Sequence, residues 1–203
     1  MPNKLVVATT NQGKLKEIKS LLADLELPLD IGYLQDYDIA SPEEPYEAFM
    51  ENAIHKAKYY AARIGEATLS EDSGLCIEAL DEFPGVRTKE FLEECGNREA
   101  AFAKLEVMMK GSDNMRAHFN CMAALYAPTH DILITGEARL EGTLTFPPKG
   151  NLGYGYQPIF IPAGYNKTLA ELDPKEKRTI THRAIAIKTV LTKWLKLSPT
   201  MQE

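Results

Sequence analysis

The pattern of apolar and polar positions along this chain predicts an alternation of strands and helices. Residues 5–8 form a short apolar run typical of a buried strand, and apolar residues then recur at helical spacing over 14–25. A long helix is expected to begin at Ser41, where Pro42 suits a first turn and Glu44 has capping-box spacing, and to end near residue 64.

The rest of the chain continues this pattern and sets the fold class. A strand, a turn and a second strand are expected over 67–80, followed by a helix over 97–109. Strands over 117–127 and 132–144 are joined by a Pro-Thr-His-Asp turn, and a helix over 181–197 ends the pattern. The prediction is an α/β protein with a mixed twisted sheet flanked by helices.

Length, composition and charge narrow the classes of partner. The 203 residues suit one sizeable core, so we expect a single domain over 1–197 and a loose C-terminal tail over 198–203. The net charge of −6 disfavours polymeric nucleic acid as a partner. No apolar stretch approaches the roughly 20 residues of a membrane span, and the N-terminal run is too short for a secretory signal. The three cysteines are odd in number and lack metal-type spacing, so we expect a reducing, cytoplasmic setting. The mildly acidic net charge still allows a small anionic molecule as the partner, because a local cluster of lysine and arginine can outweigh it.

An acidic pair stands out in residues 70–75, which have the sequence Ser-Glu-Asp-Ser-Gly-Leu. The carboxylates of Glu71 and Asp72, next to a predicted glycine turn, suit a hard cation such as Mg²⁺ that orients a water molecule. Glu44 adds a carboxylate for the same ion, and one carboxylate of the set suits a base that takes a proton from the water. The alternative is a hydrogen-bonded acidic turn without chemistry.

Residues 9–14, Thr-Thr-Asn-Gln-Gly-Lys, connect a predicted strand to a predicted helix. Backbone N–H groups at a helix start bind phosphate, and the side chains of Asn11 and Lys14 add contacts. The segment is not a P-loop, because the first glycine is missing and Leu15 replaces the hydroxyl residue that binds Mg²⁺. A plain helix cap is the alternative for this segment. Lys56, on the helix predicted from Ser41, is a further candidate, and a solvated lysine is the alternative for it.

Residues 153–158, Gly-Tyr-Gly-Tyr-Gln-Pro, lack the third glycine of a dinucleotide-binding fingerprint. Tyr154 and Tyr156 suit either a wall on which a nucleobase stacks or a pair of core aromatics. His182 and Arg183, at a predicted helix start, suit hydrogen bonds to a base or phosphate, or plain surface charge.

Taken in order, these motifs resemble the inosine triphosphate pyrophosphatase family, also known as dITP/XTP pyrophosphatases. The matching segments also include Glu-Asn-Ala-Ile-His-Lys-Ala over 51–57 and Phe-Pro-Gly-Val over 83–86, so they cover the chain from 9 to 183. The resemblance implies a two-lobed fold with a long central cleft, usually as a homodimer. It also implies Mg²⁺-dependent hydrolysis of non-standard purine nucleoside triphosphates (ITP, dITP, XTP) to monophosphate and pyrophosphate, which cleanses the nucleotide pool.

The resemblance implies roles for individual residues. Asp72 is similar to the catalytic base, and Glu44, Glu71 and Asp72 are similar to the metal site. The positions implied for the triphosphate are Thr9, Asn11, Lys14, Lys56 and Lys177. Those implied for the base pocket are Tyr154, Tyr156, His182 and Arg183, with Gln157 beside it, and Ser73 is a further substrate-binding position.

Several positions depart from the family pattern, among them two milder changes: Tyr154 replaces a commoner Phe, and Thr181 replaces Ser. Gln157 stands where the family normally has Asp, Glu90 stands in place of an arginine, and Glu71 is one methylene longer than the usual Asp. Two alternatives to the implied activity follow: a non-catalytic nucleotide-binding protein, or a pyrophosphatase with an altered base preference.

Overall fold

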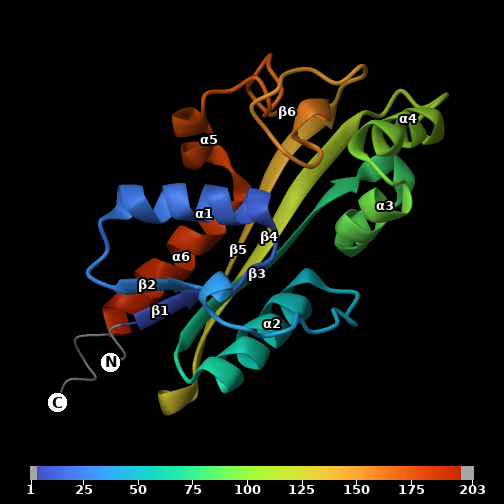
Figure 1. Cartoon of the computed structure of the whole chain (residues 1–203). Helices are drawn as coiled ribbons and strands as arrows, with labels where there is room; N and C mark the ends of the chain where they lie inside the picture. The colour runs from blue at the N-terminus through green and yellow to red at the C-terminus, as the bar shows by residue number, and fades with distance from the viewer. Residues whose placement is uncertain (1–3, 198–203) are drawn as a thin grey trace. The chain divides into compact units, whose positions relative to one another are not determined.

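The computed structural model describes residues 4–197, which form a mixed α/β fold (Figure 1). The described strands belong to one six-stranded sheet in the order β2-β1-β3-β4-β5-β6, and helices flank it. The predicted α/β class with a mixed sheet is therefore confirmed. Among the described residues, no helix is long and apolar enough to cross a membrane. The predicted tail over 198–203 lies outside the described residues.

The chain divides into two compact units. Of the described residues, the first unit contains 4–72, Cys121–Ala138 and 183–197, and the second contains Ser73–Asn120 and Arg139–His182. Three long strands contribute to both units, because the boundary falls inside each of them. These strands are β3 (Ala67–Ile77), β4 (Arg116–Ala127) and β5 (Ile132–Leu144). The cleft that the resemblance implies stays a prediction.

The first unit contains the parallel strand pairs of the sheet that involve β1. Besides its parts of β3, β4 and β5, its elements are β1 (Lys4–Val7), α1 (Gln12–Leu25), β2 (Asp30–Tyr33), η1 (Leu34–Asp36), α2 (Phe49–Ile64), η4 (Pro128–His130) and α6 (His182–Leu197, of which His182 belongs to the second unit). β1 pairs in parallel with both β2 and β3, and Val7 lies opposite Leu69. Because β3 continues beyond this point, its next residues lie beside the loop that leads from β1 to α1.

Alternation of strand side chains gives the sheet of the first unit two covered faces. Leu5 and Leu69 pack with Ile18 of α1 and Trp194 of α6 in one buried cluster. Ala124 packs with small residues of α2 in another cluster. Successive strand residues point to opposite faces. Side chains of β3 in this unit therefore face either α1 and α6 or α2 (Figure 1).

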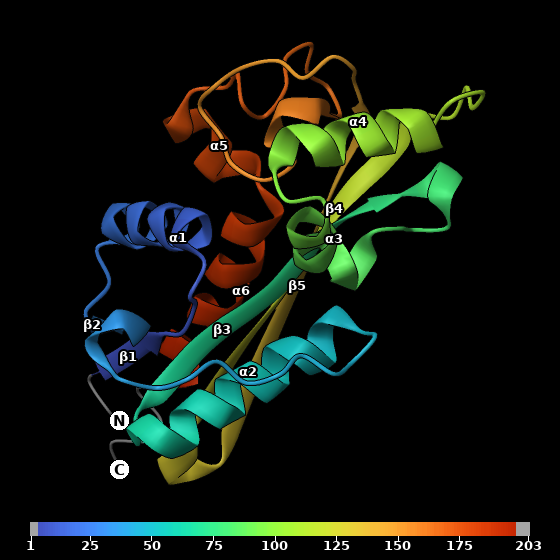
Figure 2. The same cartoon turned by 45° about the vertical axis from the view of Figure 1, so that its right-hand side comes forward.

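The second unit has its own core. Besides its parts of β3, β4 and β5, its elements are η2 (Glu78–Leu80), η3 (Gly85–Arg87), α3 (Thr88–Glu94), α4 (Arg98–Met108), η5 (Gln157–Ile159), β6 (Phe160–Pro162) and α5 (Pro174–Ile180). α3 and α4 lie side by side (Figure 2) and pack with Leu75, Phe119 and Phe160. The Phe119 and Phe160 rings meet edge to face, with centroids 4.7 Å apart.

The helix predicted from Ser41 is wrong at its start. α2 begins at Phe49, and residues 41–46 have no regular structure. Pro45 explains this, because a proline disfavours helical backbone at the residue before it, here Glu44. The Asn52 side chain instead bonds the backbone N and O of Tyr46, at 3.1 and 2.9 Å. Glu44 is consequently not a capping residue.

The turn predicted at Gly74 is also wrong. β3 passes through it as one strand, and buried residues continue on both sides. β2, α3, α5 and β6 were not predicted. The helices over 97–109 and 181–197 and the strands over 117–127 and 132–144 are confirmed, with bounds that differ by one residue at most.

Candidate active site

The loop between β1 and α1 forms a compact helix start. Asn11 is the N-cap of α1, and its side-chain oxygen accepts a hydrogen bond from Lys14 N at 3.1 Å. Thr9 Oγ1 accepts one from Asn11 N at 3.3 Å. No acidic residue lies in the first turn of α1. This helix start, with Lys14 in its first turn, therefore favours an anion.

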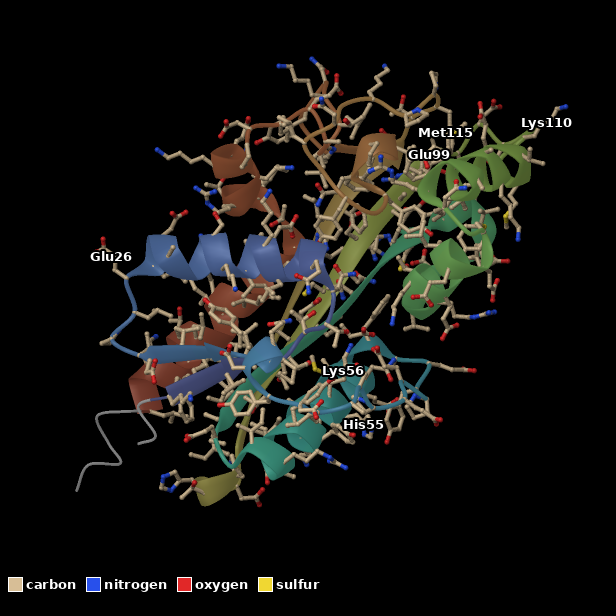
Figure 3. The ribbon with its side chains drawn as sticks, viewed as in Figure 1. Glu26, His55, Lys56, Glu99, Lys110 and Met115 are labelled. Carbon is tan, nitrogen blue, oxygen red and sulfur yellow. The ribbon has the colours of Figure 1, made fainter. Side chains whose placement is uncertain are left out.

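Asp72 projects from β3 toward α2, where Lys56 and Asn52 bind its carboxylate. Lys56 lies on α2 (Figure 3). Its Nζ lies 2.8 Å from Asp72 Oδ1 and also donates to Glu44. Asn52 Nδ2 lies 3.5 Å from the other oxygen of Asp72. Since Asn52 is itself held by the backbone of Tyr46, the orientation of Asp72 is defined from two sides.

The surroundings of Asp72 raise the pKa of its carboxyl group. Burial raises the pKa of Asp72 to about 6, because it outweighs the opposite effect of the Lys56 and Lys14 charges. Burial disfavours the charged form of Lys56 as well, but Asp72 and Glu44 outweigh this and raise the pKa of Lys56. A carboxylate poised near the operating pH beside a fixed ammonium suits general base catalysis.

Glu71 points to the opposite face of β3, toward α1 and α6. Its Oε1 lies 2.8 Å from Lys14 Nζ and 3.6 Å from Arg183 Nε, and its side chain is only 2% exposed. Burial would raise the pKa of Glu71, but Lys14 and Arg183 hold it well below its usual range. Arg183 also binds Glu17 of α1. Glu71 is therefore ionised at the centre of a buried charge network.

Lys177 and Gln157 lie together in the second unit. Lys177 is buried and donates to Leu152 O, and its Nζ lies 3.4 Å from Gln157 Oε1. A side chain at Gly153 would place its Cβ 2.6 Å from the same Gln157 oxygen. Glycine at this position thus allows Gln157 to approach the backbone closely.

The aromatic residues of the second unit have unequal positions. Tyr156 belongs to the core and donates from its hydroxyl to Thr88 O at 3.2 Å, which favours the core alternative for this tyrosine. Tyr154 and Ser73 are half-buried. The His182 ring stacks on Phe119, with centroids 4.8 Å apart and planes 4° from parallel.

Comparison with known proteins identifies the family. A sequence model of the Ham1 family matches residues 5–193. This chain belongs to the Ham1 family. The match covers both units, so the resemblance found in the motifs extends over the described fold.

Relatives of this Ham1 protein span nearly its whole length. The dITP/XTP pyrophosphatase of Aquifex aeolicus is 37% identical over 203 aligned positions, which cover 93% of this chain and 95% of the relative. That of Oceanobacillus iheyensis is 40% identical over 195, covering 95% and 98%. A solved HAM1 protein from Coxiella burnetii aligns with a TM-score of 0.84 at 33% identity, covering 95% of this chain and 98% of that one. The Staphylococcus aureus Ham1 protein gives 0.82 at 28%, covering 96% and 99%.

Two of the three carboxylates predicted to hold Mg²⁺ converge on one point. Glu44 and Asp72 both bind Lys56 Nζ, so the oxygens of the two carboxylates face the same positive charge. This fits Mg²⁺, which usually takes one or two carboxylates and keeps several waters. The oxygens of Glu71 instead contact Lys14, Arg183 and the Cys121 thiol. These contacts place Glu71 in a buried ion-pair network, and the metal role predicted for it stays a prediction.

Two residues of this network had no predicted role. Asn52 lies one helical turn before Lys56, so the sequence predicts that the two side chains share a face of the helix. The sequence does not predict the contact of Asn52 with Asp72. Glu17 pairs with Arg183, which is 166 positions further along the chain. A surface-type acid in an amphipathic helix carries no signal for such a long-range pair.

We expect Asn52→Ala to lower both activity and stability. Three hydrogen bonds are lost, including two to the backbone of Tyr46, which predicts a loss of about 1–3 kcal/mol in unfolding free energy. The turnover number should fall because Asp72 loses one of its two orienting partners. Asn97→Ala is the matched control: it removes the N-cap of α4, at a cost of about 1 kcal/mol. Equal turnover in the two variants would contradict a role for Asn52 in orienting Asp72.

Proposed function

We propose that this Ham1 protein is a Mg²⁺-dependent nucleoside triphosphate pyrophosphatase. It hydrolyses ITP, dITP and XTP to the monophosphate and pyrophosphate, and so removes non-standard purines from the nucleotide pool. The observation that carries the proposal is Asp72, a buried carboxylate whose pKa is raised to about 6 and which Lys56 and Asn52 hold in place. The names of the relatives support the substrate class.

The first unit supplies the groups for hydrolysis. Asp72 accepts the proton of the attacking water, the new P–O bond forms, and the anhydride bond between the α and β phosphates breaks. Lys14, Lys56 and the start of α1, with Thr9 and Asn11, offset the negative charge of the phosphates. Pyrophosphate leaves as the anionic product.

Glu44 and Asp72 are the residues that would hold the cation. When bound, Mg²⁺ supplies charge neutralisation on the phosphate oxygens and orientation of the water. Lys56 of α2 binds the same two carboxylates, and its positive charge offsets the repulsion between them.

Base selection is proposed for side chains of the loop 153–157 and of the start of α6. Tyr154 offers a ring for stacking, and His182 and Arg183 offer hydrogen-bond donors suited to a purine 6-oxygen. A 6-amino purine would leave such donors mismatched, which discriminates strongly. Lys177 and Ser73 complete the proposed substrate contacts.

A substrate panel tests the proposed function. ITP, dITP, XTP, GTP and ATP are incubated with the protein and Mg²⁺, and the monophosphate and pyrophosphate are separated and measured. We expect turnover of the first three and loss of turnover when the metal is chelated. Release of single phosphates would contradict the proposal. Nucleotide binding by calorimetry without any turnover would favour the non-catalytic alternative.

Gln157→Asp tests the alternative of an altered base preference. An aspartate at this position would pair with Lys177, whose Nζ lies 3.4 Å from the present amide oxygen, and would fix the 153–157 loop more firmly. We expect the kcat/KM ratio of ITP to GTP to rise by up to about tenfold, the equivalent of one hydrogen bond, mainly through KM. Asn114→Asp, which adds the same charge elsewhere in the second unit, is the control. An unchanged ratio would remove Gln157 from base selection.

The proposal also includes a homodimer that acts in the cytoplasm. The resemblance to the family supports both statements. Sedimentation equilibrium of the purified chain checks the first, with a mass of twice 22.6 kDa as the expected result, and cell fractionation checks the second.

A further inference from the structure

Three side chains of different chemistry meet in the second unit, and none of them has a proposed role in hydrolysis. Cys76 of β3, His118 of β4 and Glu82 of the loop after η2 each offer one donor atom, and these atoms lie within 4.8 Å of one another. His118 Nε2 and Glu82 Oε2 are 3.0 Å apart. Thiol, imidazole and carboxylate are together a donor set for a borderline transition-metal ion.

Strand alternation explains why Cys76 and His118 share a face. Their neighbours Leu75, Ile77 and Phe119 pack into the core with α3 and α4. Cys76 and His118 therefore point to the other face of the sheet. Both are nevertheless buried, at 2% and 0% exposed. Two potential ligands thus lie on neighbouring strands, out of contact with bulk water.

His118 is not satisfied by the groups around it. Among the described residues, neither Nδ1 nor Nε2 has a hydrogen-bond partner, although Glu82 lies close to Nε2. Burial lowers the pKa of His118, although the charge of Glu82 acts in the opposite direction. A buried polar atom without a partner is costly, and a cation between the ring and the carboxylate would satisfy it.

The backbone holds Glu82 over this pair at a conformational cost. Asp81 and Glu82 have φ values of 50° and 68°, in the left-handed region that residues other than glycine rarely adopt. Glu82 N donates to Ile77 O at 3.1 Å, which fixes the loop onto the end of β3. The Glu82 side chain is 55% exposed, so it offers an entry path from solvent to the buried donors.

We propose that Cys76, His118 and Glu82 form a binding site for a divalent transition-metal ion of the Zn²⁺ class, with one coordination position left to water. Three protein ligands and an open position are typical of zinc sites that are not purely structural. Asn120 supports the thiolate from outside, since its Nδ2 lies 3.6 Å from Cys76 Sγ. Binding releases the thiol proton to solvent and ties β3, β4 and the 78–84 loop together.

A redox or nucleophilic role for Cys76 fits the structure less well. Burial raises the pKa of the Cys76 thiol to about 12, so without a cation it is a neutral thiol and a poor nucleophile. Cys95 and Cys121 are also free cysteines and provide internal references for a test on sulfur ligation.

Co²⁺ titration of the purified full-length chain tests the site, because a thiolate ligand gives a charge-transfer absorption that oxygen ligands such as Glu44 and Asp72 do not give. We expect this band to saturate at one ion per chain and to compete with Zn²⁺. Glu82→Gln, at an exposed position, should weaken Co²⁺ binding by at least about tenfold. The neighbouring Asp81→Asn, which removes the same charge from the same loop, should bind like the wild type.

Cys76→Ala should abolish the band, with the fold checked by circular dichroism, whereas Cys95→Ser should retain it. Absence of the band in the wild type at excess Co²⁺, its persistence in Cys76→Ala, or equal affinities of Glu82→Gln and Asp81→Asn would each overturn the proposal. Pyrophosphatase activity is not the readout, so a negative result would leave the proposed function untouched.

Discussion

Asp72→Asn is expected to reduce turnover of ITP by a factor of about 10²–10⁴, the range typical for loss of a general base. The amide is nearly the same size as the carboxylate and accepts from Lys56, but it cannot take a proton from water at neutral pH. The measurement is pyrophosphate release under saturating substrate and Mg²⁺. Asp131→Asn, an aspartate that accepts from Tyr126 at the surface, is the control and should retain full turnover.

The loss of turnover should come without loss of stability. The pKa of Asp72 is raised from 3.8 to about 6 in the folded chain, so the folded state binds this proton more tightly than the unfolded state. The unfolding free energy that this proton contributes is therefore lost as the pH rises from about 4 to 6. Above that range, ionised Asp72 is less favourable in the folded than in the unfolded state. In metal-free buffer at pH 7.5, Asp72→Asn should unfold at the wild-type temperature or above it. Near pH 4, where Asp72 is protonated in the folded wild type, the two unfolding temperatures should no longer differ. A clearly less stable variant at pH 7.5 would contradict the raised pKa.

The pH profile of the wild type should show the same group. We expect kcat/KM to fall on the acid side with a midpoint at or below pH 6, because a bound cation would lower the pKa of Asp72 from its raised value of about 6. The steepness should correspond to one proton. Activity that rises as the pH falls through 6 would exclude Asp72 as the base.

Several of the sequence motifs contain residues that the structure brings together around Glu71 and Asp72, but the local pattern misjudged the backbone around Asp72. A turn at Gly74 would allow Glu71 and Asp72 to share one ion. The chain instead continues as β3, and a strand sends neighbouring side chains to opposite faces. Asp72 thus contacts Lys56 and Asn52 from α2, while Glu71 contacts Lys14 and Arg183. Glycine is a weak strand former, and only pairing with neighbouring strands overrides it.

Long-range contacts mark the limit of prediction from one sequence. The amphipathic helix over 14–25 and the strands over 117–127 and 132–144 follow from periodicity because each buries one regular face. β2 and β6, with four and three residues, are too short to show any period. The Arg183–Glu17 pair depends on how α1 and α6 pack, which no local window contains. The same holds for Cys76 and His118, which are adjacent only through strand pairing.

Glu71→Gln is expected to lower the unfolding free energy at pH 7 by about 3–5 kcal/mol, the cost typical of breaking a buried ion pair from one side. The side chain is 2% exposed, and its removal as an anion leaves Lys14 and Arg183 with less compensation. Chemical denaturation with circular dichroism measures the change. Glu17→Gln is the matched control, because Glu17 binds the same Arg183 but is 26% exposed and should cost less.

The pH dependence of this loss follows from the lowered pKa of Glu71. Burial opposes the ionised form, but Lys14 and Arg183 outweigh it, so the folded pKa lies below the ordinary value of 4.5. The stabilisation is complete above the unfolded pKa and is lost as the pH falls toward the folded one. Wild type and Glu71→Gln should therefore converge in stability on acidification below about pH 4.5. A gap that is constant down to pH 3 would show that packing, not charge, explains the loss.

The same variant separates a positioning role from a metal role. If Glu71 acts by fixing Lys14 and Arg183, Glu71→Gln raises KM for the nucleotide while the Mg²⁺ concentration for half-maximal activity stays as in the wild type. Glu44→Gln should instead raise the Mg²⁺ concentration for half-maximal activity and leave the KM for the nucleotide as in the wild type. The reason is that the carboxylates of Glu44 and Asp72 converge on one position, now occupied by Lys56 Nζ. A shift in Mg²⁺ dependence for Glu71→Gln as large as that for Glu44→Gln would return Glu71 to the metal site. Glu44 contacts Lys56 of α2, whereas Glu71 contacts Lys14 of α1 on the other face of β3. We therefore expect the effect on the KM for the nucleotide and the effect on the Mg²⁺ dependence to appear in different variants.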